Sequence, residues 1–249
     1  MSHEPRLRGV NGSRGRSIYA LNAIPPNIIV RFFAHIVYLL SVGKEDLSGD
    51  DVSIAFAKAI DGEFHKTPNG LVDVSKNNQA WSIKTVKYEN IINKKVVRLI
   101  SGRNNVLYSY PEEANLRKIS LTGKQVIEIW NGRVDEVRSK YSDFRTLVVI
   151  RSNDLRHFII FEEDTPRYEA DNYIWKKNSK RNYIAINTTT RQQAFTWQPN
   201  GSQFTIHKIV PNNASKFTLR QPETLNEETH LRDLGYNEEW VHFFIDAEE

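Results

Sequence analysis

The order of helical and strand-like segments along residues 48–150 restricts the fold of this chain more than any other feature. Ser48 is a good helix N-cap, and Asp50 and Asp51 stand in the first turn, where the helix dipole favours acidic side chains. This helix is expected to end near Gly62. Apolar periodicity then predicts strands over residues 70–74, 80–86 and 94–100, a helix over 124–140 and a buried strand over 146–150. The sequence therefore predicts an α/β fold with a mixed-sheet core.

Segments outside this core predict further elements. A largely apolar helix is expected over residues 27–40, directly after two prolines. Further strands are expected over residues 158–161, 183–186, 194–197 and 204–210, and two short helices over 225–244. The first twenty residues contain four arginines interleaved with glycines and have no apolar periodicity. We therefore expect residues 1–20 to form a flexible basic arm.

The 249-residue chain contains no cysteine, which excludes disulfides, thiolate zinc sites, iron-sulfur clusters and cysteine nucleophiles. Its longest apolar stretch, residues 28–40, is interrupted by Arg31 and His35. A membrane-spanning helix needs about 20 apolar residues, so no span is predicted. The N-terminal segment lacks the continuous apolar region of a secretory signal, and a cytoplasmic location is expected.

Charge is distributed unevenly along the chain. Residues 221–249 contain nine acidic residues and one basic residue, a net charge of −8. The remaining 220 residues contain 33 basic and 21 acidic residues, a net charge of +12. A body this basic is suited to bind a polyanion, of which nucleic acid is the commonest in a cell, although surface charge that serves solubility explains it equally well.

Three polar side chains converge on the predicted hairpin. Asp73 lies in the first strand among apolar neighbours, while Ser82 and Lys84 are two residues apart on the second strand and point to one face. A divalent cation held by a carboxylate polarises a phosphoryl oxygen and lowers the pKa of an attacking water. A lysine beside it stabilises the developing phosphorane charge or helps to deprotonate the water. This combination of residues is suited to phosphodiester hydrolysis.

The residues around this hairpin resemble the PD-(D/E)XK nuclease superfamily, and in particular bacterial type II restriction endonucleases. The resemblance covers about residues 46–151 and implies a restriction-endonuclease-like core of the order αβββαβ, with additional C-terminal strands and helices. It implies a single endonuclease domain over residues 21–249, in which residues 152–249 serve DNA recognition and dimerisation. The stretches that carry it are Gly70-Leu71-Val72-Asp73-Val74, Ala80-Trp81-Ser82-Ile83-Lys84-Thr85-Val86-Lys87, Ser101-Gly102-Arg103-Asn104 and Phe195-Thr196-Trp197-Gln198.

The resemblance also implies the residue roles, and the sequence departs from the pattern at one of them. Asp73, Ser82 and Lys84 would be catalytic, and Asp73, Ile83 and Asp51 would hold a magnesium ion. An acid is usual where this chain has Ser82, and a serine is a poor ligand for a hard dication. Some members take an acid from the preceding helix instead. Asp51 is ranked first and Glu63 second for that role, although Asp51 is equally explained as a helix-dipole acid.

Two segments are candidates for reading a DNA sequence. Arg103 and Asn104 follow a strand, and arginine and asparagine are the side chains that bond guanine and adenine edges in the major groove. Gln198 and Gln203 flank a polar turn between two apolar strands, where turn chemistry alone also explains the Asn-Gly pair. Lys87 is expected to contact phosphate. The seven histidines show no paired or HNH-like spacing, and no Walker A loop is present.

These features together predict a magnesium-dependent type II restriction endonuclease that cuts double-stranded DNA. A repair or junction-resolving nuclease of the same superfamily is the first alternative. A non-catalytic DNA-binding protein, in which Ser82 marks a decayed site, is the second. The aromatic residues of the acidic segment 221–249 follow helical spacing, so we expect this tail to dock by burial, away from bound DNA, and to pair two subunits in a homodimer.

Overall fold

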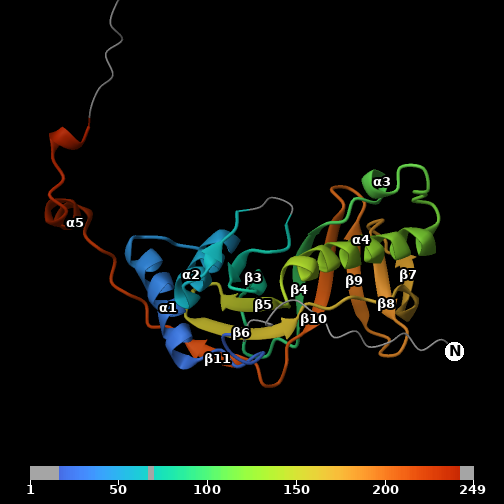
Figure 1. Cartoon of the computed structure of the whole chain (residues 1–249). Helices are drawn as coiled ribbons and strands as arrows, with labels where there is room; N and C mark the ends of the chain where they lie inside the picture. The colour runs from blue at the N-terminus through green and yellow to red at the C-terminus, as the bar shows by residue number, and fades with distance from the viewer. Residues whose placement is uncertain (1–16, 67–69, 242–249) are drawn as a thin grey trace, which may run out of the picture.

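The chain has an α/β fold with two β-sheets (Figure 1), in a computed structural model that describes residues 17–66 and 70–241. Residues 1–16, which contain most of the predicted basic arm, lie outside the described residues. Among the described residues, no helix is long and apolar enough to cross a membrane. The helices are α1 (Pro26–Ser41), α2 (Gly49–Ile60), α3 (Val106–Ser109), α4 (Ile119–Lys140) and α5 (Glu227–Asp233), with the 3-10 helices η1 (Ala170–Asn172) and η2 (Glu238–Trp240).

The first sheet is mixed and has the strand order β1-β2-β3-β5-β6-β11. Its strands β2 and β3 form the predicted hairpin, and β3 pairs in parallel with β5 over ten residues. A parallel pair requires a crossover connection, and this one contains α4. The strands are β1 (Glu63–Phe64), β2 (Val74–Lys76), β3 (Gln79–Tyr88), β5 (Asp143–Ser152), β6 (His157–Asp164) and β11 (Ser215–Thr218).

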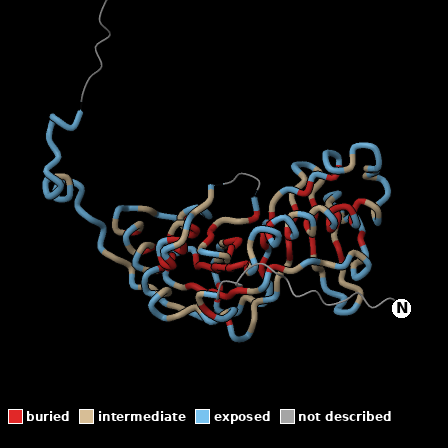
Figure 2. The backbone as a smooth tube through the Cα atoms, in the orientation of Figure 1, coloured by how far each residue is buried: buried red, intermediate tan, exposed pale blue. Residues whose placement is uncertain are grey.

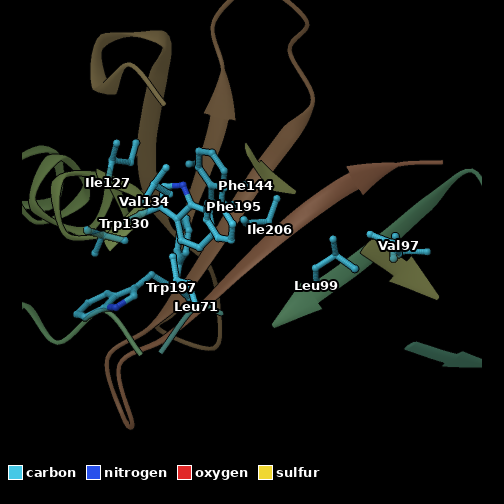
Figure 3. Packing of buried hydrophobic residues seen from close by; sticks show 14 of the residues in the cluster. Leu71, Val97, Leu99, Ile127, Trp130, Val134, Phe144, Phe195, Trp197 and Ile206 are labelled. Atoms are coloured by element: carbon cyan, nitrogen blue, oxygen red, sulfur yellow. The ribbon is translucent and has the colours of Figure 1, made fainter. Parts of the chain in front are cut away.

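The second sheet is antiparallel and has the strand order β4-β10-β9-β8-β7. Helix α4 lies across one face of this sheet (Figure 1), and Figure 3 shows Ile127, Trp130 and Val134 of α4 beside Phe195. Its strands are β4 (Val96–Arg103), β7 (Tyr173–Lys177), β8 (Tyr183–Asn187), β9 (Gln193–Gln198) and β10 (Gln203–Ile209).

Two hydrophobic clusters hold these layers together. One lies between α1, α2 and the face of the first sheet that carries Trp81, Ile83 and Val149. The other joins the opposite face of the first sheet, through Val148 and Phe161, to α4 and the second sheet. Strand β5 is buried for nearly its whole length and β3 over its first half (Figure 2), as expected of central strands covered on both faces. The hairpin that follows Asp73 therefore has its first residues of β3 buried between the two clusters.

Most of the predicted core elements are confirmed, with one correction. Helices α1, α2 and α4 lie where periodicity placed them, and Ser48 and Asp51 form a capping box at α2. The third predicted strand, residues 94–100, does form as β4, but it pairs with β10 in the second sheet. Its alternation explains this, because Val97 and Leu99 turn into the cluster shared with α4. The short strand β1, which the sequence did not indicate, pairs with β2 instead.

The acidic C-terminal segment differs from the expectation of docking by burial. Its two helices form as α5 and η2, but no residue between 221 and 241 is buried, and this stretch extends away from the body (Figures 1 and 2). Seven residues of helix are too few to bury an apolar stripe unaided. Phe243 and Phe244 lie outside the described residues.

Candidate functional site

Asp73 stands at the start of strand β2, and its carboxylate bonds the main chain of the neighbouring strand. The main-chain N–H of Ile83 donates to Oδ2 of Asp73 at 2.6 Å. This carboxylate takes the place of a carbonyl acceptor in the ladder, so the regular strand begins only at Val74 rather than at Gly70 as expected. The Oδ1 atom accepts no hydrogen bond from the described residues, and the side chain is 28% exposed. Asp73 therefore presents one open carboxylate oxygen.

The structure brings Ser82 and Lys84 to the same carboxylate. Nζ of Lys84 lies 3.6 Å from Oδ2 of Asp73, and the Ser82 hydroxyl lies 3.4 Å from the same atom. Ser82 is buried, whereas Lys84 is partly accessible. The predicted convergence of carboxylate, hydroxyl and ammonium on one side of the hairpin is thus observed. Ile83 between them points its side chain into the α1–α2 cluster and contributes only its main chain.

Glu63 of strand β1 and His65, the residue that follows this strand, form a second polar group beside Asp73. The main-chain N–H of His65 donates to the carbonyl of Asp73, and its Nε2 lies 2.7 Å from the Ser75 hydroxyl. Glu63 lies 4.0 Å from Nδ1 of His65 and is largely exposed. Since residues two apart on a strand share a face, Glu63 and His65 stand on the face of Asp73 and Ser75. Sequence spacing did not single out His65 because β1 is only two residues long.

Both carboxylate oxygens of Asp51 are engaged by neighbouring residues, which is not expected of a metal ligand. Its Oδ2 accepts hydrogen bonds from the main-chain N–H and the hydroxyl of Ser48, while its Oδ1 pairs with Lys44 at 2.5 Å. Partial burial opposes ionisation, but these hydrogen bonds outweigh it and hold the pKa of Asp51 below its usual value of 3.8. Its carboxylate therefore serves the start of α2, whereas Glu63 lies on β1, the strand that pairs with β2.

A cleft lies along the β4–β10 edge of the second sheet, and Asp73, Ser82 and Lys84 are not among its lining residues. It has a volume of about 910 Å³ and reaches from Gly70 to the turn between β9 and β10. Arg103 and Gln203, which are a hundred residues apart in the sequence, are directly paired across β4 and β10 and both line the cleft. Arg103 is exposed, and its side chain forms no ion pair or hydrogen bond with the described residues. The cleft therefore carries a free guanidinium beside an amide.

Arg133 and Tyr108 also line this cleft, and sequence reasoning missed both. Arg133 donates to the Ser101 carbonyl and to Oδ1 of Asn104. Gly102 has φ +97°, and a Cβ atom there would lie 2.7 Å from the Arg133 guanidinium, so only glycine permits this approach. Tyr108 is 83% exposed. Arg133 belongs to α4, which the periodicity assigns to core packing, and Tyr108 belongs to α3, which the sequence did not predict. Only their placement against β4 reveals them as cleft residues.

The other predicted DNA contacts are placed elsewhere. Asn104 is fully buried, donates to the carbonyl of Val126 and accepts from Arg133, which gives it a structural role. Lys87 pairs with Asp46 at 3.1 Å on the exposed part of β3. Gln198 lines a neighbouring cavity of about 480 Å³, with the basic residues Lys177, Lys180 and Arg181. The cleft therefore contains Arg103 and Gln203 of the predicted set.

The residues around Asp73 suit a magnesium ion held through a single carboxylate. Magnesium is commonly bound through one or two carboxylates, with waters and substrate phosphate completing the shell. Asp73 would hold such an ion through its open Oδ1, whereas the Ile83 N–H donates to the carboxylate and is no cation ligand. Among the described residues, no three histidine or acidic side chains cluster as a metal site. No family model, curated protein or solved structure matches this chain.

Proposed function

We propose that this protein is a magnesium-dependent endonuclease that cuts double-stranded DNA in the manner of a type II restriction enzyme. The observation that carries the proposal is the ion pair of Asp73 and Lys84 on the hairpin β2–β3, next to the parallel strand β5. Within the first sheet and its flanking helices, the chain order is α2, β1, β2, β3, α4 and β5. The third strand expected from the resemblance, residues 94–100, forms β4 of the other sheet, so an order of helix, three strands, helix and strand arises here only when β1 is counted instead.

The proposed chemistry assigns separate tasks to the three side chains. A bound magnesium ion supplies Lewis acidity to the phosphoryl oxygen and to a water molecule. Asp73 provides the anionic ligand, and the Ile83 N–H and the Ser82 hydroxyl orient its carboxylate. Lys84, held 3.6 Å from this carboxylate, places a positive charge where the phosphorane develops negative charge. The mostly buried position of Lys84 strengthens that electrostatic contribution.

The cleft supports DNA as the substrate. Its lining includes Gly70, three residues before Asp73 in the chain, together with Arg103 and Gln203. Arginine bonds guanine with two donors, and glutamine bonds adenine with a donor and an acceptor. The body of the chain carries a net charge of +12 over residues 1–220, which favours binding to phosphates.

A non-catalytic DNA-binding protein is the second candidate, and a specific observation favours it. Ser82 occupies the position where an acid is usual, and Asp51 is engaged at the start of α2. A site with one carboxylate binds a dication more weakly than a site with two. The cleft with Arg103 would then bind DNA while the hairpin served only the fold.

Incubation of the purified protein with plasmid DNA separates these functions. Discrete fragments that require magnesium and disappear with a chelator support a restriction enzyme. Nicking confined to branched or damaged DNA supports a repair enzyme of the same chemistry. Retarded mobility of intact plasmid at every magnesium concentration supports the non-catalytic protein and rejects the endonuclease.

The variant Asp73→Asn tests the site itself. Removing the charge that anchors the cation should reduce the cleavage rate at least a hundredfold, because metal-assisted stabilisation of the transition state is lost. DNA affinity, measured by gel shift in calcium, should stay within about twofold of the unaltered protein. Asp171→Asn, an exposed change on η1, serves as the control. Full cleavage by the Asp73 variant would reject this assignment.

A further inference from the structure

Helix α1 has an outer surface that this single chain leaves uncovered. The helix contains one charged residue, Arg31, among its sixteen. Phe32, Ile36 and Leu40 are buried against the body. An outer ridge, which we define as Val30, Ala34, Tyr38 and Val42, is exposed, with exposed fractions of 67% for Val30 and 54% for Tyr38. A helix that is apolar all round is normally buried all round.

The acidic tail, residues 221–241, is a second uncovered apolar surface and begins beside α1. The Leu225 N–H donates to the carbonyl of Ser41, the last residue of α1, at 2.7 Å. Beyond this bond the tail carries Leu234, Tyr236 and Trp240, all about half exposed. The rings of Tyr236 and Trp240 lie 5.7 Å apart, edge to face. Amphipathic segments of this kind are stable only when their apolar side chains are covered.

A cavity beside the outer ridge provides room for an aromatic ring. It has a volume of about 330 Å³ and lies at the start of α1, where Ile24, Ile29, Val30 and Phe217 are among its lining residues. Its lining is predominantly apolar, which suits a tryptophan or tyrosine side chain. Tyr236 and Trp240 are exposed aromatic residues on the segment that extends away from the body (Figure 2).

We propose that the tail of one copy packs on the outer ridge of α1 in a second copy, and that the second copy returns the same contact. The tail leaves its own α1 and extends outward (Figure 1), which presents Tyr236 and Trp240 to a neighbouring molecule. Residues 221–249 carry a net charge of −8 and residues 1–220 one of +12, so approach of a second copy is electrostatically favourable. Two identical contacts related by a two-fold axis close the assembly as a dimer. This inference does not rest on the proposed nuclease activity.

Introduced cysteines test the contact directly, because the full chain has none of its own. Ala34→Cys places a thiol on the outer ridge, and Glu239→Cys places one beside Trp240. Mixing the two variants, one of them lengthened by a tag, with a short bismaleimide should produce a cross-linked band containing one chain of each. Ile174→Cys, an exposed site on β7, replaces Ala34→Cys in the control and should give no such band.

The oligomeric state provides the second measurement. Light scattering of the unaltered full chain should give twice the mass of one chain at micromolar concentration. Val30→Glu or Trp240→Glu should each reduce this to the mass of one chain with an unchanged circular dichroism spectrum, whereas Ile174→Glu should not. A monomeric unaltered protein overturns the proposal. A cross-link found only within single chains carrying both cysteines also overturns it, because the tail would then cover its own α1.

Discussion

Lys84 and Lys87 lie three residues apart on β3 and differ in exposure and in their ion-pair partners. Lys84 is 19% exposed and faces Asp73, whereas Lys87 is 40% exposed and pairs with Asp46. Lys84→Ala should therefore remove cleavage with near-normal DNA affinity. Lys87→Ala should keep cleavage and reduce the salt slope of binding by about one unit. Cleavage rates and affinities across a salt series measure both, and equal, small losses in the two variants would contradict the role of Lys84.

Asp51 is expected to contribute to stability rather than to metal binding. Because its pKa is lowered in the folded state, its contribution is present above pH 3.8 and is lost as the pH falls through the folded pKa. Asp51→Asn should lower the free energy of unfolding by about 1 kcal/mol at neutral pH, as loss of a capping interaction does. The difference between variant and unaltered protein should shrink below pH 3.8. Chemical denaturation at several pH values measures this.

Glu63→Gln tests the other candidate for the second acidic ligand. Glu63 stands on the strand next to Asp73 and is the acid left for the second ligand position. Its replacement should raise the magnesium concentration needed for half-maximal cleavage several-fold, because one anionic donor is lost. Asp51→Asn should leave that concentration unchanged. The reverse pattern would return the second acid to α2.

Among the elements, α4 connects the two sheets and its packing depends on one glycine. A Cβ atom at Gly123 would lie 2.3 Å from the Trp175 ring of β7, whereas Gly132 on the same helix has open space around it. Gly123→Ala should lower the free energy of unfolding by about 1–3 kcal/mol, because it overpacks this contact. Gly132→Ala should raise it by up to about 1 kcal/mol through helix propensity. Denaturant midpoints compare the two, and stabilisation by both would show that α4 does not approach β7 this closely.

At the scale of the whole molecule, the cleft depends on how α3 and α4 pack beside strands β4 and β10. Arg103→Ala should weaken binding to the preferred DNA site by about 1–3 kcal/mol and relax sequence preference, as loss of a bidentate base contact does. Arg220→Ala, an exposed change at the opposite end of the molecule beyond β11, should do neither. Selection from a randomised DNA library measures preference. An unchanged preference in the Arg103 variant would assign the cleft to phosphate contacts alone.

Local signals predicted much of the fold correctly. Capping at Ser48, the apolar period of α4 and the hairpin turn each depend on residues close in the sequence, and all three elements formed. The short strands β1, β7 and β11 were not predicted, because two to five residues carry too little periodicity. The sheet assignment of β4 was wrong, because strand pairing depends on partners a hundred residues away.

For the candidate site, the sequence by itself determined the convergence of Asp73, Ser82 and Lys84, because hairpin register and strand alternation are local properties. It also determined the separation of a basic body from an acidic tail. Only the tertiary structure paired Arg103 with Gln203, buried Asn104 and engaged Asp51 at the start of α2. These outcomes depend on contacts between distant segments, whose free energies are decided when the layers pack and cannot be read from neighbours in the chain.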